Sequence, residues 1–378
     1  MPLDGGQAPT IAAIIPLYNG TLFIRRALES VFNQTVAPTD VIVVDDGSTD
    51  EGLTVVRAMI ADGQPIRLIS KANGGQSSAR NLGVARTDCE LIAFLDQDDV
   101  WYPTHLAVLA EPFRRPRAGP PLGWTYSNLD EANGAGRIIR RGALDFMPGT
   151  HPKTDFYSFL GTDMYVLPSA SMISRAAFLA VGGFDERLSG YEDGDLFLRL
   201  FRAGYGNVYL SEALSKWCMH NESASWSPRM RVSGMIYARK LLAEYPDDPK
   251  RDFYPTRDYI APRFLRLTQW TIFQAMRIGS PGAIRAAQED LRYMIAVAGR
   301  RPSAHEWILL VGAGRAWFAP LLTLTYTLTR PLRRGPRLAY TRLRRFRLAL
   351  AARRKAYFRG ASRTSDDYAP LRTRGLNR

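Results

Sequence analysis

Three acidic side chains follow directly on a short apolar run in residues 91–99, Leu-Ile-Ala-Phe-Leu-Asp-Gln-Asp-Asp. Such a run is typical of a central strand in a parallel sheet, and ligands of open α/β sheets bind just past the carboxyl ends of these strands. Carboxylates crowded at one point repel each other unless a cation or a hydroxyl-rich ligand compensates them. Asp96, Asp98 and Asp99 therefore indicate either a divalent-cation site, with Mg²⁺ or Mn²⁺ shared between carboxylate and phosphate oxygens, or an acidic turn that caps the next helix.

Three other segments deliver polar residues to what should be the same edge of one sheet. Residues 11–20 read as a strand that ends in a turn, and residues 41–50 as a second strand that ends in carboxylates and a Ser-Thr cluster. Residues 73–81, Asn-Gly-Gly-Gln-Ser-Ser-Ala-Arg-Asn, join a strand to a helix. Right-handed crossovers bring the ends of parallel strands together, so we expect one shared site.

These motifs, in this order, resemble those of the inverting family 2 glycosyltransferases. The resemblance rests on the motifs Ile-Ile-Pro-Leu-Tyr-Asn, Val-Asp-Asp-Gly-Ser-Thr-Asp, the 73–81 segment and Asp-Gln-Asp-Asp. It also rests on Val-Gly-Gly-Phe-Asp-Glu and Glu-Asp-Gly-Asp-Leu-Phe-Leu-Arg in residues 181–199. The resemblance covers residues 9–225. It implies an α/β protein of the GT-A fold, with a Rossmann-like, mostly parallel sheet, that uses a nucleotide-diphosphate sugar.

The resemblance also implies roles for the acidic residues. Asp98 is expected to bind the metal, Mn²⁺ or Mg²⁺, and Asp96 to contact the ribose or a metal-bound water. Asp99 would support either of them or cap a helix. His220 stands where the family often places a third metal ligand, although a lone histidine is often not a ligand.

A second set of carboxylates is expected to act on the acceptor. An inverting enzyme needs one carboxylate within hydrogen-bond reach of the attacking hydroxyl, and the resemblance favours Asp193 for this base. Glu192 is the alternative, and Asp195 is expected to cap the following helix.

The donor would be held at the other strand ends. By resemblance Asp46 reads the base, which favours uridine because a carboxylate can accept the N3–H of uracil, and Asp45 orders the turn. Tyr18 would stack on the base or lie in the core. Arg80 would contact the nucleotide or pair with Asp45 or Asp46. Further residues expected to line the donor site are Pro16, with a mainly structural role, and Asn19, Gly74, Gly75, Gln97 and Gly183.

The chain divides into a catalytic domain at residues 1–226, a helical extension at 227–304 and an apolar, then Arg-rich, segment at 305–378. Residues 130–165 are Gly-rich, charged and aperiodic, and are expected to be loops over the site. Three amphipathic helices are expected between residues 227 and 298. No Gln-x-x-Arg-Trp motif follows, so we expect transfer of a single sugar per encounter to a glycan or lipid-linked acceptor.

The net charge of +14 resides in the last 49 residues, which hold sixteen basic and two acidic residues, while the rest of the chain holds thirty-four of each. The longest charge-free piece of residues 307–329 is 14 residues, short of the roughly 20 that span a bilayer. This pattern predicts a tail, residues 305–378, that binds an anionic membrane surface. Two cysteines and no signal-like N-terminus favour a cytoplasmic enzyme that is peripheral on the inner face of the cell membrane.

Other functions fit less well. A sugar nucleotidyltransferase needs a Gly-rich phosphate loop where Pro-Leu-Tyr-Asn-Gly stands, and a haloacid-type phosphatase needs a Thr that residues 96–100 lack. A dinucleotide oxidoreductase would carry Gly-x-Gly-x-x-Gly. A non-catalytic scaffold that binds carbohydrate or nucleotide-sugar would show a damaged Asp-x-Asp motif. Binding of nucleic acid by the tail is not expected, since it lacks interleaved aromatic residues.

Overall fold

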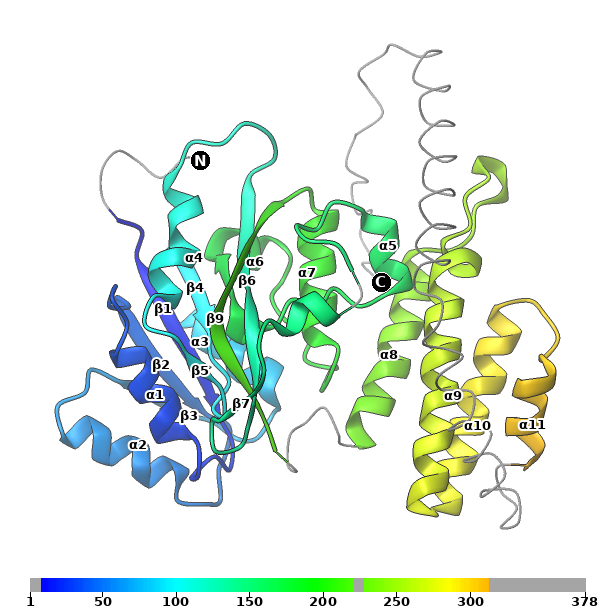
Figure 1. Ribbon diagram of the computed structural model, residues 1–378, viewed down its shortest axis with the longest axis horizontal. Helices are drawn as coiled ribbons and strands as arrows, with labels where there is room; N and C mark the ends of the chain where they lie inside the picture. Colours follow the sequence, from blue (N-terminus) through cyan, green and yellow to red (C-terminus); the bar gives the residue numbers. More distant parts are fainter. Residues whose placement is uncertain (1–7, 148, 221–227, 313–378) are drawn as a thin grey trace, which may run out of the picture.

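The computed structural model describes residues 8–147, 149–220 and 228–312 of the protein (Figure 1). These residues form a nine-stranded sheet of order β3-β2-β1-β4-β8-β6-β9-β5, with β7 paired to β6. The strands are β1 (Ile11–Leu17), β2 (Asp40–Asp45), β3 (Arg67–Ser70), β4 (Leu91–Phe94), β5 (Val100–Trp101), β6 (Leu122–Asn133), β7 (Ile138–Arg140), β8 (Ser171–Ser174) and β9 (Gly206–Met219).

The first four strands pair in parallel, β3 with β2, β2 with β1 and β1 with β4. Their connections are the helices α1 (Ile24–Phe32), α2 (Gly52–Ala61) and α3 (Gln76–Ala85). Both faces of β1 are buried: alternate residues lie in two different cores, one against α1 and α2 and the other against α3. This two-sided burial explains why the strands read as continuous apolar runs. The expected mostly parallel GT-A sheet is confirmed.

The first helix, α1, begins at Ile24, after a turn that includes Thr21. The backbone N–H and the hydroxyl of Thr21 both donate to the carboxylate of Asp50, at 2.9 and 2.5 Å. Residues 20–23 therefore form a turn fixed to the next loop. Helix α4 (His105–Arg114) follows Pro103, and α7 (Glu192–Arg202) begins at Glu192. Strand β8 leads directly into α6 (Arg175–Ala180).

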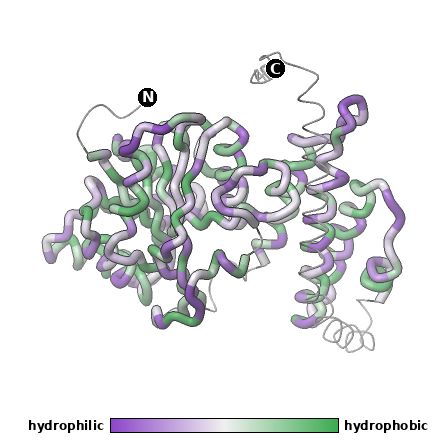
Figure 2. The backbone as a smooth tube through the Cα atoms, turned by 45° about the horizontal axis from the view of Figure 1, so that its top comes forward, coloured by the Kyte–Doolittle hydropathy of each residue, from purple (hydrophilic) through white to green (hydrophobic). Residues whose placement is uncertain are grey.

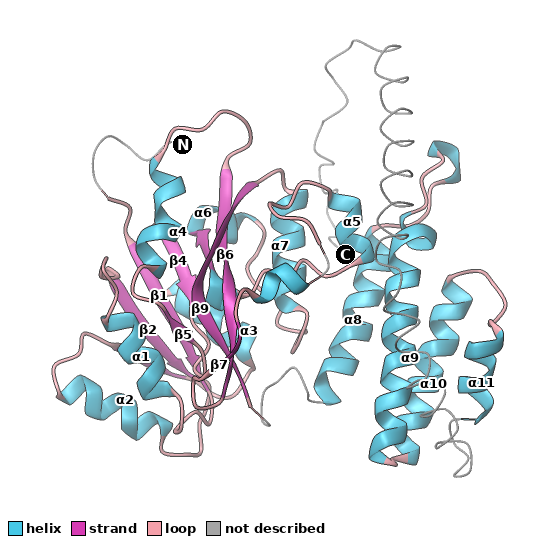
Figure 3. Ribbon diagram, in the orientation of Figure 1, coloured by secondary structure: helices cyan, strands magenta, loops and turns pink. Residues whose placement is uncertain are grey.

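The prediction of loops throughout residues 130–165 is wrong in part. Strand β6 continues to Asn133, which pairs with Met219, the last residue of β9. Strand β7 and the short helices η1 (Ala143–Phe146) and α5 (Phe156–Gly161) follow. Figure 3 shows β6 and β9 as the two longest arrows, side by side. Buried polar residues of β6, such as Asn128 and Asp130, conceal the strand from an analysis of hydrophobic pattern.

The C-terminal helices pack beside the sheet domain. They are α8 (Pro228–Glu244), α9 (Ala261–Ile278), α10 (Pro281–Val297) and α11 (Ala304–Gly312), with η4 (Pro249–Arg251) and the π-helical turn η5 (Thr256–Ile260) as shorter elements. The short helix η2 (Pro168–Ala170) belongs to the sheet domain and directly precedes β8. The tube in Figure 2 alternates between hydrophobic and hydrophilic colours along them, as expected for amphipathic helices. Helix α10 begins after Ser280, whose hydroxyl caps it by accepting from the backbone N–H of Ala283.

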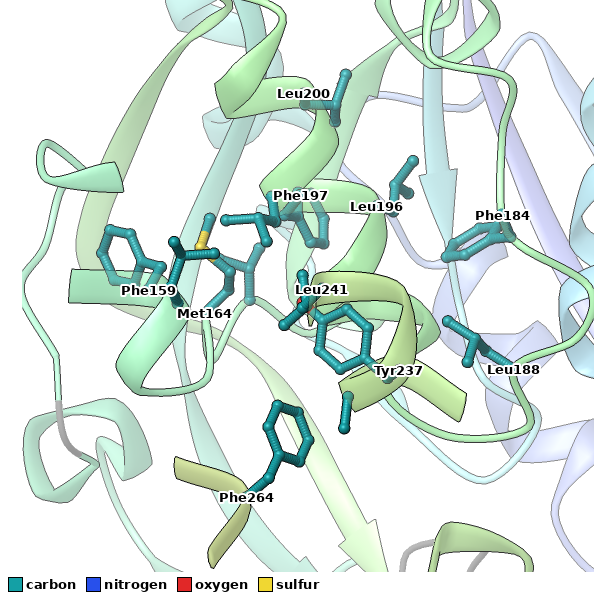
Figure 4. Packing of buried hydrophobic residues seen from close by; sticks show 14 of the residues in the cluster. Phe159, Met164, Phe184, Leu188, Leu196, Phe197, Leu200, Tyr237, Leu241 and Phe264 are labelled. Atoms are coloured by element: carbon teal, nitrogen blue, oxygen red, sulfur yellow. The ribbon is translucent and has the colours of Figure 1, made fainter. Parts of the chain in front are cut away.

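One hydrophobic core runs from the sheet into these helices. Figure 4 shows Leu196 and Phe197 of α7 packed near Tyr237 of α8 and Phe264 of α9, and all four side chains are buried. The boundary at residue 226 stays a prediction, but the helices after it share their core with the catalytic part. Among the described residues no helix has both the length and the apolar character needed to cross a membrane. Of the predicted apolar and Arg-rich segment 305–378, residues 313–378 lie outside the described residues.

Candidate active site

The carboxyl ends of β1, β2 and β4 lie side by side, since these strands are neighbours and parallel. They are followed by Tyr18, Asp46 and Asp96, which the sequence analysis assigned to the donor site. Glu192 and Asp193 lie at the start of α7. Arg80 connects this turn to the end of β4, because it donates to both Glu192 and Asp96.

Asp46 is buried and hydrogen-bonded at both carboxylate oxygens. Oδ1 accepts from Lys71 Nζ at 2.7 Å and from the backbone N–H of Gly74 at 2.9 Å, and Oδ2 accepts from the N–H of Gly75 at 2.7 Å. Gly75 has φ +89°, a conformation that side chains disfavour. Asp46 therefore fixes the glycine loop, and Asp45 orders its own turn through the N–H of Ser48 at 3.1 Å. The base-reading role of Asp46 stays a prediction.

The turn after β1 is fixed by side chains. Gln97 accepts from the N–H of Tyr18 at 2.8 Å and donates to its carbonyl at 3.0 Å. The side-chain oxygen of Asn19 accepts from the backbone N–H of Thr49 at 2.8 Å. The backbone of Asn19 has a φ of +49°. Tyr18 is 45% exposed, so the prediction that it lies in the core is wrong, and its ring is accessible to a ligand. Pro16 lies within β1 opposite Val44.

Arg80 links the two halves of the site. Its buried guanidinium donates to Asp96 and, at 3.2 Å, to Glu192. It also lies over the ring of Phe184, 5.1 Å from the centroid. The alternative that Arg80 pairs with Asp45 or Asp46 is wrong, because Lys71 occupies that position.

Asp98 meets His220, with Oδ2 and Nε2 at 2.8 Å. The His220 ring stacks on Phe23, with centroids 4.4 Å apart, and Arg26 donates to the carbonyls of Asp98 and Gly134. Burial, and then the charge of Asp96, raise the pKa of Asp98. The described residues contain no cluster of three or more metal-ligating side chains. A carboxylate and an imidazole that converge in this way fit a divalent ion whose other ligands are diphosphate oxygens.

The helix-capping role expected of Asp99 is wrong. Asp99 is buried, and its Oδ1 accepts from the backbone N–H of Cys218 at 2.9 Å. The N-cap of α4 is Thr104, which makes no side-chain capping bond. Burial and the charges of Asp98 and Asp96 raise the pKa of Asp99 well above its ordinary value. Asp99 thus fastens the exit of β4 to β9, just before His220.

Asp193 is the less engaged of the two candidate bases. Within the described part of the chain its Oδ1 accepts only from the N–H of the adjacent Gly194, at 2.7 Å, whereas Glu192 is paired with Arg80. Burial, then the charges of Glu192 and Asp163, raise the pKa of Asp193 well above its ordinary value. Burial likewise raises the pKa of Glu192, although Arg80 opposes this effect.

The expectation that Asp195 caps α7 is wrong as well. Asp195 is buried and forms ion pairs with Arg199 at 2.8 Å and with Lys240 of α8 at 2.6 Å. The N-cap is Tyr191, in the left-handed conformation and without a side-chain capping bond. Asp195 therefore anchors α7 to the helical extension.

Gly183 lies in a tight turn beside this helix. Its φ is +68°, and a Cβ there would approach the Asn81 side-chain oxygen to 2.7 Å. Asn81 forms two hydrogen bonds with the backbone of Phe184, each of 2.9 Å. The donor-pocket role of Gly183 is untested, but the turn is firmly attached to α3.

The sequence analysis missed several residues around the site. Asp163 lies beside the first turn of α7, since a Cβ on Gly194 would come within 2.8 Å of its Oδ1. Arg263 of α9 is buried, donates to the carbonyl of Phe159 at 3.1 Å and lies 3.8 Å from Asp163. Neither belongs to a recognisable motif; Lys71 and Asn81 at least stand within or next to the 73–81 segment.

Comparison with known proteins agrees with this geometry. Residues 12–182 match the family model "Glycosyl transferase family 2", and the chain carries a glycosyltransferase domain of that family.

Two relatives illustrate the range of the match. The hyaluronan synthase of Pasteurella multocida is 28% identical over 198 residues, which are 52% of this chain and 19% of that protein. An uncharacterized glycosyltransferase of Rickettsia bellii is 30% identical over 294 residues, 68% of this chain and 40% of the relative. The chain thus spans well under half the length of these relatives.

Among solved structures, S. aureus TarS 1–349 in complex with UDP-GlcNAc aligns with a TM-score of 0.57 and 16% identity. The alignment covers 82% of this chain and 91% of that one. At this identity the likeness establishes the fold, and it extends beyond the sheet into the helices that follow.

Proposed function

We propose that this protein transfers a single sugar, with inversion and with the help of Mn²⁺ or Mg²⁺, from a nucleotide-diphosphate sugar to a hydroxyl of a glycan or lipid-linked acceptor. The observation that carries the proposal is the bridge made by Arg80. It joins Asp96, at the end of a parallel strand, to Glu192, next to the candidate base Asp193. A group that binds the donor and a group that receives a proton are thereby held in one rigid unit.

On the donor side, the residues have separate tasks. The exposed ring of Tyr18 would stack on the nucleoside base, and Asp96, whose side chain is 27% exposed, would accept from the ribose hydroxyls. Asp98 and His220 would hold the metal ion, which supplies charge neutralisation for the diphosphate leaving group when bound. A UDP-sugar is favoured by the expected role of Asp46 and is consistent with the UDP-GlcNAc named for TarS.

On the acceptor side, Asp193 takes the proton of the attacking hydroxyl. Its raised pKa makes it a stronger base than an ordinary aspartate once it is ionised. The N-terminal end of α7 carries a partial positive charge that stabilises the ionised carboxylate. Glu192 shares its charge with Arg80 and serves as the positioning residue, with the alternative assignment of Glu192 as base still open to test.

The reaction can be tested with the purified full chain and a panel of UDP-, dTDP- and GDP-sugars, with mass spectrometry of the products. We expect hydrolysis or transfer with one donor class, loss of turnover in EDTA, and recovery with Mn²⁺ or Mg²⁺. Proton NMR of the new anomeric centre should show inversion. Full turnover in EDTA would contradict the metal requirement, and a retained anomer would contradict the role of Asp193.

The location of the enzyme is a separate part of the proposal. The positive charge of residues 330–378 supports binding to the cytoplasmic face of an anionic membrane, at about 1 kcal/mol for each engaged basic residue. Sedimentation with phosphatidylserine vesicles should retain the full chain at low salt and lose most of it at high salt. A chain that ends at Thr329 should bind weakly at either salt concentration. A full-length protein that stays in the supernatant at low salt would contradict this part alone.

A further inference from the structure

A cavity of about 450 Å³ lies apart from the carboxylates described above. Its walls are Tyr102 after β5, Asn128 and Asp130 of β6, the segment from Ile138 to Asp145, and Lys216 of β9. None of these residues belongs to the candidate donor site or to the first turn of α7. The cavity therefore requires its own explanation.

The cavity is connected to the candidate metal ligands through shared elements. Lys216 and His220 are four residues apart along one strand and its extension, about 13 Å at the usual rise of a strand. Tyr102 follows Asp98 by four residues on the other wall. The turn after β6 contacts both places: Lys216 Nζ lies 3.5 Å from the carbonyl of Gly136, and Arg26 joins the carbonyl of Gly134 to that of Asp98.

The inner wall of the cavity is a fixed polar surface. The carboxylate of Asp130 is 2% exposed and accepts from the Tyr102 hydroxyl at 2.8 Å and the N–H of Gly142 at 3.0 Å. Asn128 accepts from the N–H of Leu144 at 3.0 Å and donates to Asp145 Oδ1 at 3.1 Å. These bonds hold the wall in place before any ligand arrives, which lowers the cost of binding.

Three polar groups of the lining retain hydrogen-bonding capacity. Among the described residues, the one hydrogen-bond contact of Lys216 Nζ is the 3.5 Å contact with Gly136, besides its position 5.5 Å from the centre of the Tyr102 ring, and Asp145 uses only Oδ1. The guanidinium of Arg141 is 79% exposed and lies 3.5 Å from Asp130. Two cations and one carboxylate oxygen at the same cavity suit a ligand with several hydroxyls and a negative charge.

We propose that this cavity is an acceptor subsite, which binds a unit of the acceptor glycan remote from the reacting hydroxyl and prefers a unit that carries a carboxylate. The inference rests on the proposed transferase function, because it takes the acceptor to be a glycan. Lys216 and Arg141 would bind the carboxylate, and Asp145 would accept from sugar hydroxyls. A glycan bound there would run along β9 toward His220 and the donor.

The subsite can be tested by calorimetry on the full chain, without nucleotide or metal. The probes are a hyaluronan hexasaccharide, which carries carboxylates, and cellohexaose, which does not. We expect the acidic probe to bind at least tenfold more tightly than the neutral one, and Arg141→Ala or Lys216→Ala to weaken it about tenfold. Arg115→Ala, an exposed arginine of similar accessibility (71%), serves as the matched control and should bind as the native chain does.

Each outcome is decisive for the subsite. Absence of binding by either probe, or binding that both variants leave unchanged, would overturn it. Equal binding of the neutral probe would overturn the preference for a carboxylate. Arg141 is largely solvent-exposed, so its replacement should leave folding intact, and thermal unfolding checks this for each variant. Turnover of a nucleotide-sugar by the native chain tests the transferase function independently of these results.

Discussion

The donor edge of the sheet and the first turn of α7 are both rich in carboxylates, yet the two regions use them differently. At the donor edge, Asp46 accepts three hydrogen bonds, from Lys71 and from the backbone N–H groups of Gly74 and Gly75. At α7, Asp193 accepts one local bond and faces the charges of Glu192 and Asp163. A carboxylate with several donors holds a loop in place, whereas burial, and then these two neighbouring charges, give Asp193 the raised pKa of a proton acceptor.

The two regions also differ in which structural elements hold them in place. The donor edge is built from local loops that follow consecutive strands. The α7 turn depends on distant elements, because Asp195 pairs with Lys240 of α8 and Asp163 lies next to Arg263 of α9. The helical extension is therefore part of the structure that positions the proposed base.

The largest expected effect comes from Asp193→Asn. Loss of a general base typically lowers kcat by about 10²–10⁴-fold, while the Kd of the donor should change little because Asp193 lies on the acceptor side. Glu192→Gln should have a smaller effect on kcat, and Asp62→Asn, on the exposed end of α2, should have none. A normal kcat in Asp193→Asn together with a strongly reduced kcat in Glu192→Gln would assign the base to Glu192.

Removal of Arg80 tests whether the two regions are held together. Arg80→Met leaves Asp96 and Glu192 without their shared cation, and loss of one partner from a buried ion pair typically destabilises by about 3–5 kcal/mol. The matched control is Arg67→Met, because the Arg67 side chain is 54% exposed whereas that of Arg80 is 1% exposed, so this substitution should cost at most about 1 kcal/mol. Urea unfolding measures the free energy of unfolding of both variants. Equal stabilities would show that Arg80 is not a structural bridge.

The parallel half of the fold could be predicted because its information is local. Apolar runs bounded by turn residues locate β1, β2 and β4, and the order of the motifs places their polar ends together. The roles of Asp99 and Asp195 could not be predicted, because their partners Cys218 and Lys240 are remote in the sequence. Aspartate before a helix suggests a cap, and only the packed structure shows that both residues instead fasten separate elements to each other.

Strand β6 illustrates a different limit. Its second half contains Asn128, Asp130 and Glu131, all buried, so it lacks the alternation that identifies a strand. Their hydrogen bonds come from other segments, as from Gly142 and Tyr102 to Asp130 and from Arg140 of β7 to Glu131. A cavity wall made of polar residues is therefore read from sequence as a loop.

A smaller effect than loss of Arg80 is expected for His220→Ala. Whether His220 binds the ion or only orients Asp98, its loss should weaken metal affinity by about 10–100-fold. Calorimetry with UDP should show weaker binding in the presence of Mn²⁺ and unchanged binding without metal, which is an internal control. Equal weakening under both conditions would indicate that His220 acts through the fold of the donor edge and not through a metal ion.

The smallest effect, and the one that most sharpens the comparison, concerns Asp163. The groups that face Asp193 are Glu192 and Tyr191 of its own turn, Asp163 from the preceding loop and Arg80 from α3. Because a base must be unprotonated to act, a raised pKa of Asp193 shifts the acidic limb of kcat/KM toward higher pH. Asp163→Asn removes one repelling charge, so the pKa of Asp193 should fall and the acidic limb should move to lower pH.

A pH series of kcat/KM for the native chain, Asp163→Asn and the control Asp62→Asn measures this shift, with kcat at high pH as the reference for intact protein. Glu192 and Arg80 are unchanged in these variants, so a displacement of the limb reports the charge of Asp163 alone. An unchanged profile would mean that Asp163 does not influence the base. A limb displaced to higher pH would mean that Asp163 stabilises the ionised base through Arg263 or a bound water. The base in the α7 turn would then resemble Asp46 at the donor edge, whose charge is held by several donors.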